Sequence, residues 1–204
     1  MTNPWTLILL EDYENHMNSN EVQQYPVLNK IMNLQLNSYK YKRVIVLGSG
    51  GGNGLEYANK DSEIYCVDVN SEFLEETQKR YSDIKNLKTL CLDLRTDFQK
   101  LPQADLIIAN LLVEYIGYNS FKSIIELVKP KYISCVIQVD SNESFVSESK
   151  YIHKFDSLES IHNNIDAKKL TEILNKIGYK KIVEKENILP NKKILLQLDY
   201  TKCK

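Results

Sequence analysis

The residues most suited to chemistry lie in the stretch 43–57, which reads RVIVLGSGGGNGLEY. An apolar run at 44–47 leads into a turn that holds five of the chain's seven glycines. Such a run followed by glycines is typical of a buried parallel strand and a tight turn. Glycine tolerates positive φ and lets a ligand approach the main chain, whereas elsewhere it weakens an element. We therefore interpret this turn as a ligand-binding loop. Its glycines are Gly48, Gly50, Gly51, Gly52 and Gly54.

Polar side chains follow the next three predicted strands. Asp68 ends the second strand twenty residues after Gly48, Asp93 ends the third, and Asn110 ends the fourth. In an open α/β sheet, ligands bind outside the carboxyl ends of the strands, where the strand order reverses. A carboxylate at the end of the second strand can accept hydrogen bonds from both hydroxyls of a ribose. The spacing therefore predicts a nucleoside-binding site.

The glycine spacing bears on which nucleoside would bind. The dinucleotide fingerprint G-x-G-x-x-G does not fit, because its sixth position falls on Asn53 or Leu55, depending on the start. The pattern that fits is G-x-G-x-G, from Gly48 to Gly52. A pyrophosphate needs the amides of a helix N-terminus, whereas a ligand without phosphate needs only close approach to the backbone. The spacing argues against a nicotinamide dinucleotide and leaves it as an alternative.

The elements that must position these residues follow an α/β order. Strands are predicted at 44–47, 63–69, 87–92, 104–109, 132–139, 181–188 and 193–198, and helices at 55–59, 71–81, 121–128 and 166–177. The first 40 residues are expected to form a helical cap, with 11–17 left as a polar, mixed segment and a helix from about residue 20. Residues 140–164 show no clear periodicity. We predict one domain, 1–204, made of the cap (1–40) and a Rossmann-like core (41–204). The core is a doubly wound, mostly parallel, seven-stranded sheet with an antiparallel C-terminal edge hairpin.

Composition narrows the class of partner. The 204-residue chain contains 43% hydrophobic and 26% charged residues, which is typical of a soluble globular protein. Its formal net charge is -1, so no overall electrostatic field favours binding to nucleic acid or to an acidic membrane. The four cysteines form no C-x-x-C pair, and no run is long enough for a signal peptide or a membrane span. We therefore expect a cytoplasmic protein without a metal, and leave the oligomeric state open.

With these motifs in view, the chain resembles class I S-adenosylmethionine-dependent methyltransferases over nearly its whole length. VIVLGSGGGNG is similar to their first motif, IYCVDVN to their second, LCLDLRTD to their third and ADLIIANLLVEYI to their fourth. The resemblance implies that the glycine turn lines the methionine part and ribose of S-adenosylmethionine and that Asp68 binds the ribose hydroxyls. Asp93 would bind the adenine amino group, with Leu94 packing on the ring, and Asn110 and Leu111 would flank the transferred methyl. The implied cofactor-binding set is Tyr13, Gly48, Ser49, Gly50, Gly52, Asn53, Asp68, Val69, Asp93, Leu94, Asn110 and Leu111.

One position departs from the family pattern. Relatives often carry an acidic residue two places before the first glycine, where it orders the loop or reaches the cofactor's amino group. This chain has Val46 there. Tyr13, His16 or Asn53 could supply polar contacts in its place.

Catalysis by methyl transfer depends mainly on alignment of the acceptor with the methyl, and a general base is optional. The candidates for that base are His16, Glu114, Tyr115, His153 and His162. The thirteen tyrosines form no basic-aromatic stripe, and Asn110 is followed by two leucines rather than by the Pro-Pro motif of many nucleic-acid enzymes. We therefore predict a small-molecule acceptor. The alternatives are an NAD-dependent oxidoreductase and an adenosyl-cofactor-binding protein without turnover.

Overall fold

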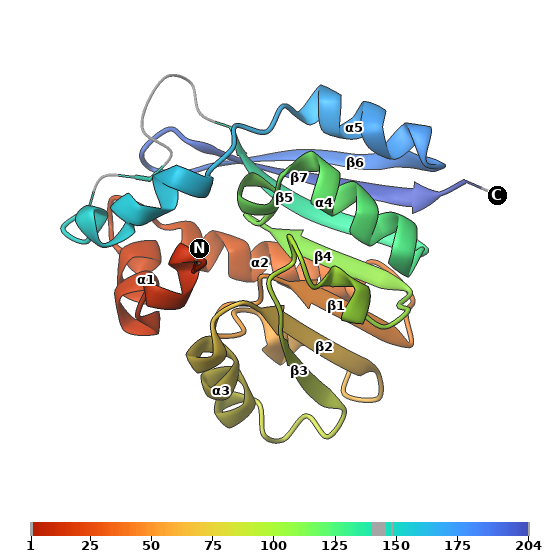
Figure 1. Cartoon of the computed structure of the whole chain (residues 1–204), viewed down its shortest axis with the longest axis horizontal. Helices are drawn as coiled ribbons and strands as arrows, with labels where there is room; N and C mark the ends of the chain where they lie inside the picture. Colours follow the sequence, from red (N-terminus) through yellow and green to blue (C-terminus); the bar gives the residue numbers. More distant parts are fainter. Residues whose placement is uncertain (1, 140–145, 148, 204) are drawn as a thin grey trace.

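One mixed sheet of seven strands runs through the molecule, in the order β3-β2-β1-β4-β5-β7-β6 (Figure 1). The computed structural model describes residues 2–139, 146–147 and 149–203. Neighbours from β3 to β5 are parallel, and β7 is antiparallel to both β5 and β6. The predicted sheet and its antiparallel edge hairpin are confirmed. The strands are β1 (Arg43–Leu47), β2 (Glu63–Asp68), β3 (Leu87–Cys91), β4 (Leu106–Asn110), β5 (Tyr132–Val139), β6 (Tyr179–Ile188) and β7 (Ile194–Lys202).

The strand order reverses between β1 and β4, in the middle of the sheet. In register, Leu47 of β1 lies opposite Val67 on one side and Ala109 on the other. The glycine turn, Asp68 and Asn110 follow directly after these three residues in the chain. The register therefore brings all three predicted site positions to one edge of the sheet, where ligands bind in open α/β folds.

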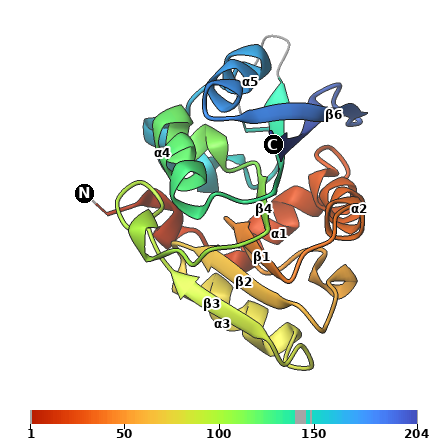
Figure 2. The same cartoon turned by 90° about the vertical axis from the view of Figure 1, so that its right-hand side faces the viewer.

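Helices cover both faces of the sheet. On one face, α4 (Val113–Val128) and α5 (Ala167–Lys176) pack on an apolar layer that includes Ile107, Phe121 and Leu170. On the other, α2 (Gln24–Asn37) and α3 (Ser71–Arg80) bury residues such as Met32 and Leu74. Figure 2 shows α4 and α5 on the opposite side of the sheet from α2. Each fully buried Leu, Ile or Phe contributes about 1.5–3 kcal/mol, so these layers fix the sheet edge that carries the site.

The N-terminal segment is more ordered than its sequence suggests. Residues 11–17, a polar and mixed segment for which no element was predicted, lie in helix α1 (Leu10–Asn18), which follows a 3-10 turn, η1 (Pro4–Leu7). Leu10 and Tyr13 lie one turn apart and pack on an apolar cluster with Phe73 of α3, while Met17 packs on α2. Tertiary contacts therefore stabilise a helix whose own sequence is mostly polar.

No α-helix follows β1, although a short helix was predicted at 55–59. Residues 48–62, all of them described, contain only a 3-10 turn, η2 (Leu55–Tyr57). A Cβ added to Gly54 would lie 2.5 Å from the side chain of Met32, so this residue of α2 packs directly against the turn. Helix α2 thus covers the face that a helix after β1 would otherwise occupy.

Two other boundaries differ from the prediction. Helix α4 begins at Val113 rather than at 121, and Gly117, with φ 72°, interrupts it between the two positions. The stretch predicted to be irregular contains a 3-10 helix, η4 (Ile152–Ile161), while residues 140–145 and 148 lie outside the described part. A further 3-10 turn, η3 (Phe98–Lys100), follows β3.

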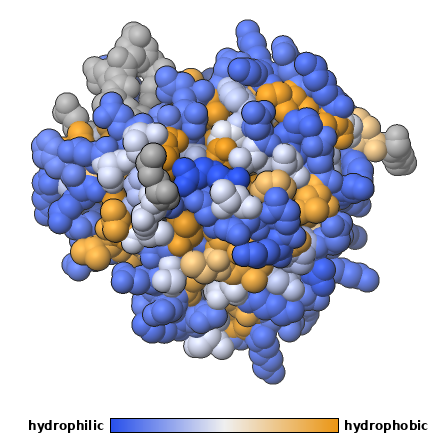
Figure 3. Space-filling view, viewed as in Figure 1, coloured by the Kyte–Doolittle hydropathy of each residue, from blue (hydrophilic) through white to orange (hydrophobic). Residues whose placement is uncertain are grey.

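The surface seen in Figure 3 is mainly hydrophilic, and its hydrophobic side chains form separate groups. In the described ranges, no helix combines the length and apolar character needed to cross a membrane.

Candidate active site

A cavity opens at the carboxyl ends of β1 to β5, and its empty volume is about 1080 Å³ when its open mouth is included. The glycine turn and the strand ends form its floor. The N-terminal segment and, from later in the chain, Val146, Ser147, Phe155, Leu158 and His162 contribute further walls, together with Trp5 and Tyr13. The cavity therefore lies where the sequence places a nucleoside site.

The glycine turn forms one wall with its bare backbone. Gly48 and Gly50 have φ of 64° and 54°, and a Cβ on Gly48 would come within 3.0 Å of the Leu112 side chain. The backbone N–H of Gly50 donates to Asp68 Oδ2 at 2.9 Å, and that of Asn70 donates to Oδ1 at 3.0 Å. Burial raises the pKa of Asp68, and the two N–H donors partly oppose that rise. The Asp68 carboxylate therefore lines the cavity, and the two main-chain N–H donors hold it in a fixed orientation.

Asn70 supports the site without lining the cavity, and no role in the site was predicted for it. Its side-chain oxygen caps α3 by accepting from the N–H of Glu72, and its amide donates to the carbonyls of Trp5 and Ile8, each at 3.0 Å. One side chain therefore ties the residue beside Asp68 to the N-terminal segment that walls the cavity. An Asn-Ser pair before a helix was a readable N-cap signal, but its second role depends on long-range contacts.

Asp93 lies at the end of β3 in a strong local ion pair. Arg95 reaches its carboxylate with the backbone N–H and with guanidinium nitrogens at 3.1 and 2.7 Å. Asn3 of the N-terminal segment also donates to it at 3.0 Å. Chiefly through the Arg95 hydrogen bonds, the pKa of Asp93 falls to about 2. This acceptor stays ionised at any physiological pH.

Asn110 is held by a buried partner on α2. The side-chain amides of Asn110 and Gln35 form two reciprocal hydrogen bonds of 2.8 Å, and Gln35 is 0% exposed. The next residue, Leu111, has φ 52°, which is uncommon for a residue with a side chain and typical of functional turns. The end of β4 is therefore rigid where it meets the cavity.

Aromatic rings line the cavity next to the N-terminal segment. Trp5 makes edge contacts with Tyr13 (5.8 Å between ring centroids) and Tyr115 (5.0 Å), and Tyr13 stacks on Phe73 at 5.9 Å. His162 contacts the Tyr115 ring at 5.6 Å. Burial raises the pKa of Tyr13 and of Tyr115, so both hydroxyls keep their protons. Tyr115 is therefore unsuited to act as a base.

The three candidate histidines have different surroundings. His16 lines the cavity, its Nδ1 lies 2.8 Å from Ser149 Oγ, and its ring contacts Phe155. Burial, with a smaller contribution from the charge of Lys193, lowers the pKa of His16 to about 4. His162 also lines the cavity. The side chain of His153 is 90% exposed, faces Asp156 and does not line it.

Glu114 enters the cavity from the first turn of α4. Its Oε1 accepts from the backbone N–H of Gln138 at 2.8 Å, beyond the last residue of β5 that pairs with β4. The amide of Gln24 in turn donates to Gln138 Oε1 at 2.6 Å. Both glutamines line the cavity and were missed, although Gln138 lies at a strand end where such residues were sought.

Three predicted cofactor residues do not line the cavity. Asn53 links the turn to α2 by accepting from Asn29 and donating to the carbonyl of Tyr25. A Cβ on Gly52 would meet the Tyr81 ring at 2.8 Å, so this glycine lets α3 pack closely. Ser49 donates its N–H to the carbonyl of Val67. The other nine predicted positions line it: Tyr13, Gly48, Gly50, Asp68, Val69, Asp93, Leu94, Asn110 and Leu111.

The position of Val46, where relatives carry an acid, is buried under α2. Glu14 of α1 reaches the turn from outside, because its carboxylate pairs with Arg80 of α3 and accepts from the Tyr25 hydroxyl. A Cβ on Gly51 would lie 2.7 Å from Glu14 Oε1. A carboxylate from another element thus packs on the turn, and no local sequence pattern predicts this contact. Across the part of the chain that the structure describes, no group of three or more potential ligands could hold a metal ion.

The comparisons with known proteins agree with this geometry. A family model described as a methyltransferase domain matches residues 45–131. A search of curated proteins finds no significant match. The N-methyltransferase NodS from Bradyrhizobium japonicum WM9, in complex with S-adenosyl-L-homocysteine, has a similar structure with a TM-score of 0.67 and 10% identity, over 96% of this chain and 98% of that one. Magnesium protoporphyrin IX methyltransferase (ChlM) from Synechocystis PCC 6803 gives a TM-score of 0.62 and 9% identity, over 94% and 93%.

The strand order and the cavity at the switch point define a methyltransferase-type α/β fold. Residues 45–131 match a methyltransferase domain, and the chain as a whole has the fold of the S-adenosylmethionine-dependent methyltransferases to which it is similar.

Proposed function

We propose that this protein transfers a methyl group from S-adenosylmethionine to a small-molecule acceptor within the cavity. Asp68 would hold the ribose hydroxyls, Asp93 the adenine amino group, and the turn at Gly48 and Gly50 the methionine part. The observation that carries the proposal is the hydrogen bond from Gly50 to Asp68, which joins the bare turn and the ribose acceptor in one wall. Asn110 and Leu111 would then face the methyl.

The lining residues fit this cofactor on three counts. Gly48 has positive φ, and an added Cβ there would lie 3.0 Å from the Leu112 side chain, so the backbone that lines the cavity at this point is bare. Two ionisable acceptors, Asp68 and Asp93, lie at neighbouring strand ends, where hydroxyl and amino donors are needed. Among the described residues, no lysine or arginine lines the cavity, which suits a cationic sulfonium. A pyrophosphate would lack both a cation and the N-terminus of a helix after β1, so NAD is disfavoured.

The cofactor supplies a methyl group that is already activated by its positively charged sulfur. The task of the chain is therefore to align the acceptor, which can contribute about 7–11 kcal/mol to rate acceleration. The fixed pair Asn110–Gln35 and the left-handed Leu111 hold that end of β4 in one geometry. The rings of Trp5, Tyr13 and Tyr115 contact one another and give the same cavity an apolar wall.

The shape of the cavity supports a small acceptor and turnover. It continues beyond Asn110 to His16, Gln24, Glu114 and Gln138, which belong to four different elements. A protein that only binds the cofactor needs no such space. His16 and Glu114 are the residues there that can accept a proton, whereas the buried Tyr115 hydroxyl cannot.

The proposal is tested by incubating the protein with S-adenosylmethionine and a pool of small metabolites and measuring S-adenosylhomocysteine by mass spectrometry. We expect product that depends on both the pool and intact Asp68. Absence of product from every metabolite fraction, with the cofactor bound, would favour the binding protein without turnover. A hydride transfer to NAD in the same fractions would favour the oxidoreductase.

A further inference from the structure

The carboxylate of Asp93, at the end of β3, has its hydrogen-bonding capacity filled by the protein itself. A carboxylate offers about four lone-pair sites. Oδ1 accepts the backbone N–H of Arg95 at 3.0 Å and its side-chain Nε at 3.1 Å. Oδ2 accepts a terminal guanidinium nitrogen of Arg95 at 2.7 Å and the side-chain amide Nδ2 of Asn3 at 3.0 Å. A ligand that needs this acid must therefore displace one of these donors.

Asn3 is the donor that is displaced most easily. Arg95 lies two residues from Asp93 and holds it through three hydrogen bonds, two of which come from the charged guanidinium. Asn3 lies 90 residues away in the chain and offers one neutral amide. A bidentate pair of opposite charges is stronger than a single hydrogen bond from a neutral donor. Displacement of Asn3 therefore leaves the stronger contact in place.

The Asn3 side chain can leave Asp93 while the segment that carries it stays folded. Asn3 is half-buried and lines the cavity, and its Oδ1 accepts the N–H of Trp5 at 3.1 Å as the N-cap of η1. The segment is anchored separately, because Asn70 donates to the carbonyls of Trp5 and Ile8. A rotation of one side chain is therefore enough to free Oδ2 of Asp93.

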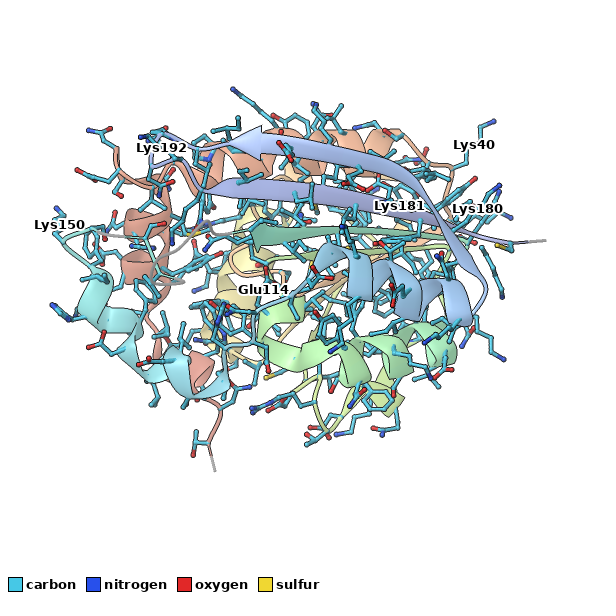
Figure 4. All side chains as sticks on the ribbon, turned by 90° about the horizontal axis from the view of Figure 1, so that it is seen from above. Lys40, Glu114, Lys150, Lys180, Lys181 and Lys192 are labelled. Carbon is cyan, nitrogen blue, oxygen red and sulfur yellow. The ribbon has the colours of Figure 1, made fainter. Side chains whose placement is uncertain are left out.

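The amide of Asn3 and the amino group of adenine are chemically alike. Each presents a planar NH2 group on an sp2 carbon, which donates hydrogen bonds. The proposed function assigns the adenine amino group to the same carboxylate. Among the described residues no lysine lines the cavity, and Figure 4 shows the lysines that it labels projecting from the periphery of the molecule. Asn3 therefore occupies the hydrogen-bonding position that the adenine amino group needs.

We infer that Asn3 is a latch on the adenine part of the site, which competes with the cofactor for Oδ2 of Asp93 and swings away when the cofactor binds. This inference rests on the proposed function. The closed latch keeps the acid paired in the free protein. It also lowers cofactor affinity, because the apparent dissociation constant is the intrinsic one divided by the fraction of open molecules. A purine without an amino group has no donor with which to replace Asn3, so the latch favours adenine.

The test is a thermodynamic cycle of one variant and one modified ligand. Asn3→Ser removes the donor to Asp93, while the serine hydroxyl keeps an N-cap for η1. The ligands are S-adenosylhomocysteine and its 6-deamino analogue, in which purine replaces adenine. Calorimetry on the full chain measures each affinity. We expect N3S to bind S-adenosylhomocysteine about tenfold more tightly than the unmodified protein does, and to bind the analogue with unchanged affinity, since only the amino group competes with Asn3.

Asn37→Ser is the matched control, because the Asn37 amide donates to Asn33 within α2, at an exposed position outside the cavity. It should change neither affinity. The inference is overturned if N3S and N37S bind S-adenosylhomocysteine equally, or if N3S binds it more weakly, which would make Asn3 a cofactor ligand. An equal gain for both ligands in N3S would also overturn it, because Asn3 would then be only a steric block. If N3S does not fold, Asn3→Thr, which keeps the cap in the same way, replaces it in the cycle.

The two levels of the account fail in different ways. If the unmodified protein does not bind S-adenosylhomocysteine, the proposed function is removed and this inference with it. If the protein binds S-adenosylhomocysteine tightly but N3S affects the two ligands alike, the inference is removed and the proposed function stands.

Discussion

The carboxylate of Asp68, at the end of β2, accepts a hydrogen bond of 2.9 Å from the backbone N–H of Gly50, in the turn after β1. The acid at one strand end thus fixes the turn at the next. Because β1 and β2 are parallel and in register to Leu47 and Val67, this contact follows from the sheet itself. It places a charged acceptor beside bare backbone, the combination that an adenosyl ligand without phosphate needs.

Replacement of Asp68 by alanine is expected to weaken S-adenosylhomocysteine binding by at least about 100-fold, since two hydrogen bonds from the ribose to a charged acceptor are lost. Calorimetry on the folded variant measures the change. Asp97→Asn is the control, because Asp97 is an exposed acid paired with Lys100 outside the cavity. Unchanged affinity in D68A would show that the ribose lies elsewhere.

Gly50→Ala separates the role of the turn in binding from its role in folding. Gly50 has φ 54°, and an added Cβ would lie 3.6 Å from the Tyr13 ring, so the fold tolerates it with strain of about 1–2 kcal/mol. Gly178→Ala introduces similar strain, at φ 87°, with nothing within 4 Å and away from the cavity. Chemical denaturation should show comparable losses in both variants, and calorimetry should show weaker cofactor binding in G50A alone. Equal affinities would mean that the cofactor does not touch this glycine.

Asn70→Ala should do more than remove a helix cap. An N-cap is worth about 0.5–2 kcal/mol, and Asn70 also donates to the carbonyls of Trp5 and Ile8. Asp166→Ala is the control. Asp166 caps α5 because its carboxylate accepts a hydrogen bond from the N–H of Lys169, but it does not tether the N-terminal segment. Hydrogen exchange should therefore speed up across residues 3–18 in N70A but not in D166A. If both variants protect that segment equally, Asn70 does not hold it.

The stability of the protein should depend on pH through His16. Its pKa in the folded chain is about 4, below the value of 6.5 for a free histidine, so folding disfavours its protonation. The stabilising contribution is complete above pH 6.5 and is lost as the pH falls toward 4, by at most about 3 kcal/mol. Urea denaturation at several pH values should show a shallower decline in His16→Gln. His153→Gln changes an exposed histidine, so the pH dependence of its unfolding free energy should match that of the unmodified protein. If the unfolding free energy of H16Q declines with falling pH as steeply as that of the unmodified protein, the account is contradicted.

The sheet could be predicted because its signals are local. Apolar runs ending in glycine or in Asp68, Asp93 and Asn110 mark both the strands and the edge at which they end. The absence of a helix after β1 could not be predicted, since it depends on Met32 of α2 packing against Gly54. Helix α1 was missed because its stability comes from contacts with other elements rather than from its own polar sequence.

The cavity floor was predictable for the same reason, but its walls were not. Trp5 and Gln24 reach the site from the N-terminal segment, and Phe155 comes from η4, far along the chain. Asn53 and Gly52 illustrate the opposite error, because they share the glycine turn but face α2 and α3. A motif fixes where the backbone passes, and only tertiary packing decides which side chains face the ligand.

The most direct measurement is a crystal structure of the protein with S-adenosylhomocysteine. The account predicts that the ribose hydroxyls lie within hydrogen-bond distance of the Asp68 carboxylate, that the adenine lies beside Asp93 and Leu94, and that the sulfur faces Asn110 and Leu111. A ligand bound away from the glycine turn, or a crystal grown at millimolar ligand with protein side chains filling that space, would contradict it.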